Sequence, residues 1–280
     1  MHPHKIEAAF EAACWQDIAA LKPGNVHIYA DGHDMVAADF LVSAQLAAPQ
    51  ICRPDASLGA RIETGVQATQ GRGRKNTNLG ILLLCAPLAM AAQSISGQYL
   101  SAQDLRGALA KVLANLTQED ARAVSRAMAL ESADGIGDGA AHEMRDGADM
   151  RLMEAMTLAA PRDAVARQYV THFADVFDLG LIAIGYQPSR KWGAVSAYFE
   201  FLATYPDGHI ERKFGAGPAQ YVQAKAIKLR DRLNRARTMS ATLPELLALD
   251  RDFKTQGLNP GTSDDLTVAS LFVAELLHVA

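Results

Sequence analysis

The sequence predicts an all-α protein, a single-domain multi-helix bundle built around a buried central helix. Hydrophobic residues make up 49% of the chain but aromatic residues only 6%, which suits close-packed helices better than strands rich in aromatic and β-branched residues. Apolar residues recur at helical spacing along most of the chain, and no strand-length alternation competes with them. The composition never shifts as it would at a linker, so residues 1–280 are interpreted as one domain.

The first three helices are predicted from apolar periodicity and from their end signals. Periodic residues run from Ile6 to Leu21 and stop at Lys22-Pro23-Gly24, which supplies a helix breaker and a turn. The second helix is expected to begin after Asp34, which is well placed to cap it. The third covers about Ser57 to Thr69 and runs into a glycine-rich segment at 71–78.

The segment from Leu79 to about Gln93 is apolar on nearly all sides, so it is predicted to be the central helix of the bundle. The segment at about 132–147 is rich in Gly and Asp and is predicted to be a flexible loop, either a lid or a mobile connection. Further helices are expected at Ala102–Ala114, Gln118–Leu130, Met150–Ala159, Asp163–Ile184, Trp192–Thr204, Pro218–Met239, Leu243–Gln256 and Thr262–Val279.

Charge and hydropathy exclude several function classes. A net charge of -4 argues against a nucleic-acid binder, which needs clustered Lys and Arg to neutralise phosphates. No apolar run reaches the roughly 20 residues of a membrane span, and no export signal is recognised, so a cytoplasmic protein without a membrane partner is expected. Cys14, Cys52 and Cys85 fit neither a disulfide framework nor a zinc site and are interpreted as reduced core thiols. A homodimer is a further expectation, because such apolar helices often pair.

Polar junctions between the predicted helices are the best candidates for chemistry, because binding and catalytic groups concentrate on loops held by a rigid scaffold. Four junctions stand out: Lys22-Pro23-Gly24-Asn25-Val26-His27, His33-Asp34-Met35 with Asp39, Gly71 to Gly80, and Asn259 to Leu266.

Spacing alone leaves two interpretations open at the first and third junctions. Glycines and Lys75 lead into a helix N-terminus, which favours an anion, yet the Walker spacing is absent and Asn78 could simply cap the helix. Lys22 could aim its ammonium at an anion, or it could be a solvated charge at a helix C-terminus.

The other two junctions are equally open. Asp264 and Asp265 stand in the first turn of the last helix, where Thr262 and Asp265 also fit a capping box. Neighbouring helical residues point about 100° apart, so at most one of the two carboxylates should face a common site. His33 and Asp34 are either site residues or ordinary loop residues, and residues 207–213 are predicted to be an exposed loop.

Taken in this order, the junctions resemble the triphosphoribosyl-dephospho-CoA synthase family. The chain departs from the better known members where they usually have a His-Lys pair, since Asn78-Leu79 stands there, and their mid-chain Arg-Gly-Glu element is not evident. It looks more like a divergent branch associated with one-carbon coenzymes. The elements that carry the resemblance are Lys22-Pro23-Gly24-Asn25-Val26, His33-Asp34-Met35, Asn76-Thr77-Asn78-Leu79-Gly80, Asp207-Gly208-His209-Ile210 with Lys213, and Gly261-Thr262-Ser263-Asp264-Asp265-Leu266.

The resemblance implies an all-helical transferase of coenzyme biosynthesis that joins ATP and 3'-dephospho-CoA and releases adenine. An analogous transfer to a tetrahydromethanopterin- or methanofuran-type coenzyme is the variant that the divergence favours. Two alternatives stay open: a non-catalytic nucleotide- or coenzyme-binding protein, and a hydrolase of a nucleoside or ADP-ribosyl bond.

The same resemblance, with the chemistry of glycosyl transfer, implies a role for each candidate residue. A base, cations or Mg²⁺ on the triphosphate, and hydrogen-bond donors are needed. The catalytic candidates are Asp34 and Asp265. Mg²⁺ is expected, with Asp34, Asp264 and Asp265 as ligands. The phosphate and nucleotide candidates are Lys22, Lys75, Lys213, His33, Asn76 and Asn78.

Overall fold

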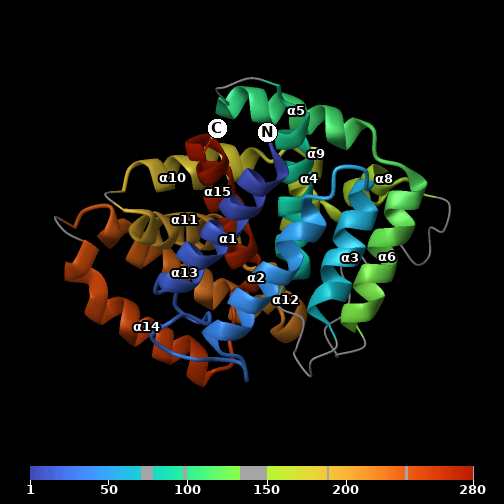
Figure 1. The fold of residues 1–280 in the computed structure, drawn as a ribbon. Coiled ribbons are helices and arrows are strands. Elements are labelled where there is room, and N and C mark those ends of the chain that lie inside the picture. Colours follow the sequence, from blue (N-terminus) through green and yellow to red (C-terminus); the bar gives the residue numbers. More distant parts are fainter. Residues whose placement is uncertain (71–77, 97–99, 133–149, 188, 237–238, 280) are drawn as a thin grey trace.

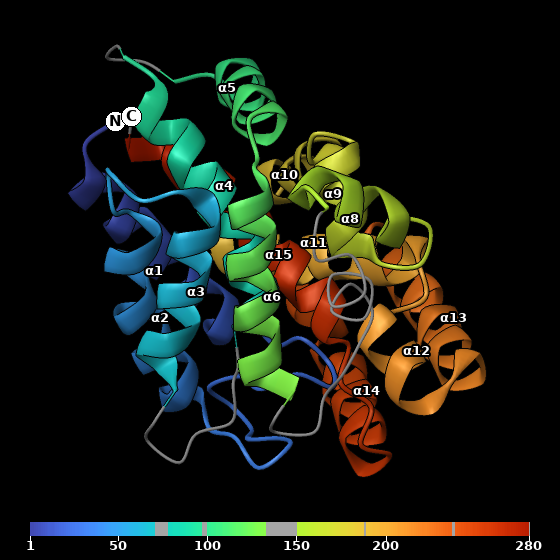
Figure 2. The same ribbon diagram turned by 90° about the vertical axis from the view of Figure 1, so that its right-hand side faces the viewer.

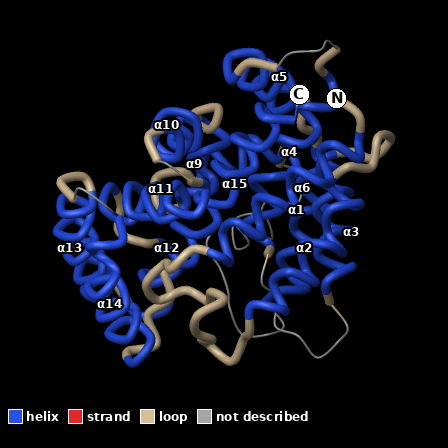
Figure 3. Tube along the Cα trace, turned by 60° about the vertical axis from the view of Figure 1, so that its left-hand side comes forward, coloured by secondary structure: helices blue, strands red, loops and turns tan. Residues whose placement is uncertain are grey.

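The computed structural model describes residues 1–70, 78–96, 100–132, 150–187, 189–236 and 239–279. Every named element in these ranges is helical, and only two isolated bridges, His27–Ala30 and Gly32–Met35, shape the loop after the first helix (Figure 3). The predicted all-α fold is confirmed. The predicted loop at 132–147, apart from its first residue, lies outside the described residues, as do Lys75 and Asn76.

Two long helices form the centre of the fold, α4 (Leu79–Ser94) and α15 (Gly261–Val279), and they pack against each other. One group of helices covers them on the side of the N-terminal half of the chain, and a second group covers them on the other side (Figures 1 and 2). The first group is α1 (Pro3–Ala19), α2 (Ala37–Ile51), α3 (Leu58–Thr69), α5 (Ala102–Ala114) and α6 (Gln118–Ser132). The second includes α10 (Leu181–Gly185), α11 (Arg190–Thr204), α12 (Gly208–Phe214), α13 (Ala216–Leu233) and α14 (Leu243–Thr255).

The prediction that α4 is central is confirmed, because 12 of the residues in this helix are buried, from Leu79 to Ala92. α15 shares this position, since it packs against α1 and α11 as well as α4. Phe272 of α15 meets Phe10 of α1 edge to face, with ring centroids 5.7 Å apart. Apart from such aromatic pairs, most of the residues that fill the interior are aliphatic or small, as the composition predicts.

The predicted helix Asp163–Ile184 is wrong as a single element. The chain instead forms α9 (Ala164–Val170), a π-helical turn η1 (Val176–Gly180) and α10, after α8 (Leu152–Ala159). The break falls at His172 and Phe173, whose φ angles of 52° and 59° lie in the left-handed region and end a right-handed helix. The short turn η2 (Met239–Thr242) likewise separates α13 from α14, where the predicted helix ran on to Met239.

The predicted capping role of Asp34 is also wrong. Helix α2 begins at Ala37 with Val36 at the N-cap, and the backbone N–H of Val36 donates to Asp39 Oδ2 over 3.1 Å. Asp34 lies two residues before that cap, on the exposed surface. Its carboxylate is thus not the group that starts the helix.

The cysteines behave as predicted. All three are free thiols, with Cys52 and Cys85 buried and Cys14 partly so, and burial raises the pKa of each. Within the described part of the chain, each helix falls short of the length or apolar character that crossing a bilayer requires.

Candidate functional site

Lys22 is fully buried, with no exposed side-chain area. Its ammonium donates to Asp17 of α1 and to Asp264 in the first turn of α15. A solvated lysine is therefore excluded. The ammonium is paired with two carboxylates of the protein itself, Asp17 and Asp264.

Two carboxylates share this one ammonium, and the burial of all three groups alters their proton affinity. Burial raises the pKa of Asp17 to about 7, with the charge of Asp264 acting in the same direction and Lys22 opposing it. Burial raises the pKa of Asp264 as well, against the opposing effect of Lys22. Burial would lower the pKa of Lys22, but the two carboxylates outweigh it and hold that pKa above its ordinary value.

Asp264 is the most exposed member of this triad. The side chain of Asp264 keeps 13% of its area exposed, whereas that of Asp17 keeps 5% and that of Lys22 none. Asn25 is buried beside Asp264, and its amide lowers the pKa of that carboxyl although its Nδ2 atom makes no well-aligned hydrogen bond among the described residues. The ammonium of the first junction therefore pairs with a partly exposed carboxylate of the fourth, that of Asp264.

Buried side chains from separate elements fix the turn that carries Lys22. The Tyr198 hydroxyl of α11 donates to the Pro23 carbonyl over 2.6 Å, and the Gly24 N–H donates to Asp250 Oδ1 of α14 over 2.9 Å. Gly24 has a φ of 89°, and a Cβ there would lie 2.8 Å from the Leu258 carbonyl oxygen. The turn thus requires glycine, both for its left-handed backbone and for its close approach to the start of α15.

Asp250 is a residue of the candidate site that sequence reasoning missed. Besides the Gly24 N–H, its carboxylate lies 3.3 Å from His27 Nε2 and 3.1 Å from Lys254 Nζ. Lys254 also donates to the Ala30 carbonyl over 3.1 Å. The only sequence signal was the i,i+4 spacing of Asp250 and Lys254, which is typical of ordinary surface ion pairs on helices. These contacts fasten the loop after α1 to α14, beside which it runs in Figure 1.

His33 and Asp34 form a tight left-handed turn, with φ angles of 56° and 60°. Two successive non-glycine residues in this region are uncommon, and such strain is concentrated at functional sites. His33 Nε2 lies 2.8 Å from the Gly24 carbonyl oxygen, which joins the second junction to the first. Asp34 is exposed.

The prediction of an exposed loop at 207–213 is wrong. Asp207 is buried, caps α12 by accepting from the backbone N–H of His209 and Ile210, and accepts from both the backbone N–H and the hydroxyl of Ser263 over 2.8 Å. Burial raises the pKa of Asp207, and the Ser263 hydrogen bonds oppose that shift. One carboxylate therefore ties the start of α12 to the first turn of α15.

Asp264 and Asp265 point to different partners, as their helical spacing predicts. Asp264 faces Lys22, whereas a carboxylate oxygen of Asp265 lies against Gly80 in the first turn of α4. Asn78 precedes that helix without capping it, and its buried amide donates to Ser43 over 2.9 Å. The N-termini of α4 and α15 thus meet at the site.

The remaining candidates are less well placed. Lys213 is exposed on α12, with its ammonium 5.3 Å from the centroid of the Phe214 ring. In the described ranges, no three His, Cys, Asp or Glu side chains are grouped so that they could hold a metal ion, so Asp34, Asp264 and Asp265 do not form a ready metal centre there.

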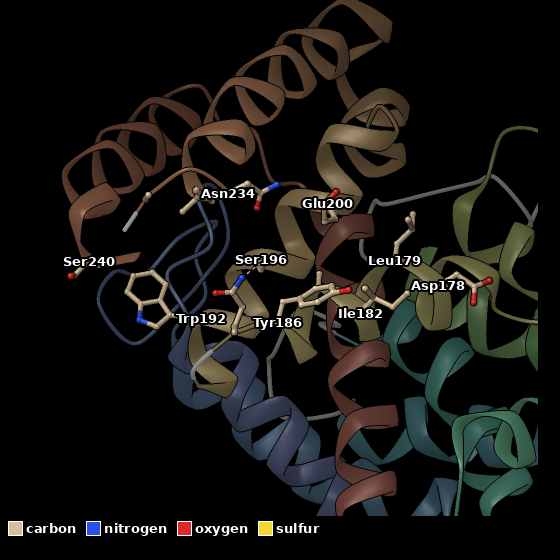
Figure 4. Close-up of a pocket in the computed structure, with 13 residues that line it drawn as sticks. Asp178, Leu179, Ile182, Tyr186, Trp192, Ser196, Glu200, Asn234 and Ser240 are labelled. Carbon is tan, nitrogen blue, oxygen red and sulfur yellow. Dashed lines mark hydrogen bonds between the residues drawn. The ribbon is translucent and has the colours of Figure 1, made fainter. Parts of the chain in front are cut away.

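A cavity of about 780 Å³ lies elsewhere, between η1, α10, α11 and the end of α13, and none of the candidate residues lines it. Figure 4 shows Tyr186 and Trp192 among the side chains of this pocket. The site described above is therefore not the pocket of Figure 4.

Comparison with known proteins agrees with the ordered junctions. A crystal structure from Archaeoglobus fulgidus, of a protein provisionally named a triphosphoribosyl-dephospho-CoA synthase, superposes with a TM-score of 0.65 at 25% identity, covering 84% of this chain and 97% of that one. No curated protein matches the chain. The family described as CitG, ATP:dephospho-CoA triphosphoribosyl transferase, matches residues 3–280. The chain therefore belongs to this family and is a transferase of the triphosphoribosyl-dephospho-CoA synthase type.

Proposed function

We propose that the chain transfers the triphosphoribosyl group of ATP to a ribose hydroxyl of 3'-dephospho-CoA. The hydroxyl oxygen forms a bond to C1 of the ATP ribose as the bond from that carbon to adenine breaks. The proton lost by the hydroxyl is passed to a base, and the departing adenine gains a proton, so the reaction is balanced without a redox partner. The transition state has the oxocarbenium character of glycoside chemistry.

The observation that carries this proposal is that the buried ammonium of Lys22 orients the carboxylate of Asp264. A general base must be held within hydrogen-bond reach of the proton that it accepts. Asp264 forms a salt bridge with Lys22 and keeps part of its side chain exposed. It lies where the N-termini of α4 and α15 meet. Burial also raises the pKa of its carboxyl, which makes it a stronger base than an exposed aspartate. We assign the base to Asp264, with Asp265 and Asp34 as the further carboxylates of the site.

Mg²⁺ enters this proposal together with the triphosphate. The ion commonly binds through one or two protein carboxylates, substrate phosphates and water, and therefore needs no complete protein cage. Asp265 provides one such carboxylate, since Asp264 faces Lys22 and is assigned as the base. A bound Mg²⁺ would supply charge neutralisation for the phosphates.

A transfer to a different coenzyme is the second form of this proposal. Asn78-Leu79 replaces the His-Lys pair of the better known members, and Asn78 is committed to Ser43 inside the protein. This supports a changed acceptor, for which tetrahydromethanopterin- and methanofuran-type coenzymes are the candidates. We place the reaction in the cytoplasm, where ATP is made and used, and a homodimer, which light scattering would reveal, remains part of the proposal.

Adenine release tests the proposal. Purified protein is incubated with ATP and Mg²⁺, with and without each acceptor, and adenine is measured by chromatography. Acceptor-dependent adenine supports the transfer, and adenine without acceptor supports the hydrolase. ATP binding without adenine formation supports the binding protein.

A matched pair of variants tests the role of Asp264. Asp264→Asn should reduce the rate about 100-fold or more. Asp104→Asn changes an exposed capping aspartate of α5 and should leave the rate unchanged. Full activity of Asp264→Asn would remove this residue from the mechanism.

A further inference from the structure

The proposed transfer does not use the cavity of about 780 Å³ in Figure 4. Three separate parts of the chain line this cavity: η1 with α10, one face of α11, and the end of α13 with the residues that follow it. Trp192, Ser196 and Glu200 of α11 are spaced four residues apart, so they share one face of that helix. The volume is in the range of pockets that bind small organic molecules.

The π-helical turn η1 forms part of the cavity wall, through Asp178 and Leu179. Single π-helical turns are rare and often occur at functional sites. Gly180, the last residue of this turn, packs so closely on α15 that an added Cβ would lie 2.0 Å from Ser270 Oγ. The wall is therefore anchored to one of the two central helices.

Two aromatic side chains and a hydrogen-bonded pair also line the cavity. Tyr186 keeps 82% of its area exposed, whereas Trp192 is partly buried. In the view of Figure 4, their rings lie on either side of Ser196, whose hydroxyl oxygen accepts from Gln187 Nε2 over 3.3 Å. An exposed tyrosine ring in a cavity that also contains a tryptophan offers a large aromatic contact area to a ligand.

The charge of the cavity is set by two carboxylates, Asp178 and Glu200, since none of its described lining residues is Lys, Arg or His. Nη1 of Arg106 lies 2.9 and 3.0 Å from the two carboxylate oxygens of Asp178. Arg230 lies 3.7 Å from Glu200 but only 3.1 Å from Asp231. Glu200 is therefore the less completely neutralised of the two carboxylates and can attract a cation from solution.

We propose that this cavity is a second ligand site, which binds a small organic cation with an aromatic ring. The ring of the ligand packs against Tyr186 and Trp192, and its ammonium pairs with Glu200. The faces of tyrosine and tryptophan rings attract cations as well. Both substrates of the proposed transfer carry phosphate groups, which the carboxylates repel, so the inference goes beyond the proposed function.

Helix α11 connects this cavity to the candidate site. Tyr198, roughly 200° around the helix from Ser196, donates to the Pro23 carbonyl over 2.6 Å. A ligand in the cavity therefore contacts the helix that holds the turn of Lys22.

Phenethylammonium is a suitable probe, with 2-phenylethanol and 3-phenylpropanoate as its neutral and anionic counterparts. Binding is followed by the fluorescence of Trp192 in Trp15→Phe protein, because the chain has only these two tryptophans. The cation should change the emission saturably and bind roughly tenfold more tightly than either counterpart, as expected for one charge-assisted contact.

A matched pair of glutamate variants tests the role of Glu200. Glu200→Gln should weaken phenethylammonium binding roughly tenfold and leave 2-phenylethanol binding unchanged. Glu245→Gln is the control, because Glu245 is also paired with an arginine, Arg232 at 2.6 Å, and does not line the cavity. It should leave the binding of all three probes unchanged. Tyr186→Ala changes a highly exposed residue, which should not disturb the fold, and should weaken the cation about threefold or more.

The outcomes decide the inference independently of the proposed transfer, because adenine release is not measured. Preference for the cation that is lost in Glu200→Gln but kept in Glu245→Gln supports the site. The site is overturned by equal affinity for the three probes, by the lack of a saturable response, or by equal losses in the two glutamate variants. Unchanged cation binding in both Glu200→Gln and Tyr186→Ala overturns it as well.

Discussion

A carboxylate oxygen of Asp265 fills the space that a side chain on Gly80 would need. Its Oδ2 atom lies 2.0 Å from the position of a Cβ at residue 80, a distance that a non-bonded carbon and oxygen could not keep. The contact joins the first turn of α15 to the first turn of α4. Residue 80 must therefore be glycine for Asp265 to stay in place.

Gly80→Ala should displace Asp265 and reduce adenine release by about tenfold or more. The fold should lose at most about 2 kcal/mol of stability, because the clash costs about 1–3 kcal/mol while alanine favours a helix by about 1 kcal/mol over glycine. Gly107→Ala on α5 is the control, since nothing lies within 4 Å of its added carbon, and it should be fully active and slightly stabilised. A fully active Gly80→Ala protein would show that the position of Asp265 does not matter.

Lys22→Met should destabilise the protein by about 3–5 kcal/mol, because it leaves two carboxylates buried without their cation. Urea unfolding measures the change. Adding Asp17→Asn to Lys22→Met should recover part of the loss, since one of the stranded charges disappears. A loss below about 0.5 kcal/mol, as at an ordinary surface position, would contradict the sealed triad.

The stability difference between the wild type and His209→Asn should depend on pH. The pKa of His209 is about 4 in the folded protein and ordinarily 6.5, so the unfolded chain binds the extra proton between these values. The wild type should therefore lose stability relative to the variant as the pH falls from about 6.5 to 4. Asp17 does not affect this comparison because both proteins contain it. Unfolding curves at several pH values give the difference, and a constant offset would refute the lowered pKa.

The boundaries of a helix were predictable where a single apolar stripe extends from its N-cap residue to its C-cap residue. Ala102–Ala114 is reproduced to the residue, with Ser101 and Asp104 forming a capping box. The predictions fail where the local backbone conformation overrides the apolar periodicity. One example is the left-handed turn at His172, which divides one predicted helix. The seven-residue α12 was missed because a helix this short shows hardly two turns of pattern.

The site was predictable as a set of junctions but not as a set of contacts. Lys22 and Asp264 were both identified, yet their pairing joins residues 242 positions apart, and no spacing rule covers such a distance. Asp17 and Asp250 are acidic residues inside helices, a position that usually indicates contact with solvent. Only the packing of α1 and α14 places them beside the Lys22-Pro23-Gly24 turn.

The contact between α1 and α15 also bears on the order of events during synthesis on the ribosome. Lys22 and Asp17 emerge early, whereas Asp264 emerges only with the last helix. Until α15 docks, the lysine pocket is open on one side and the groove beside α1 and α4 lacks its apolar filling. We therefore expect a nascent chain without α15 to expose that groove and to need chaperone protection, and the candidate site to form only when α15 docks.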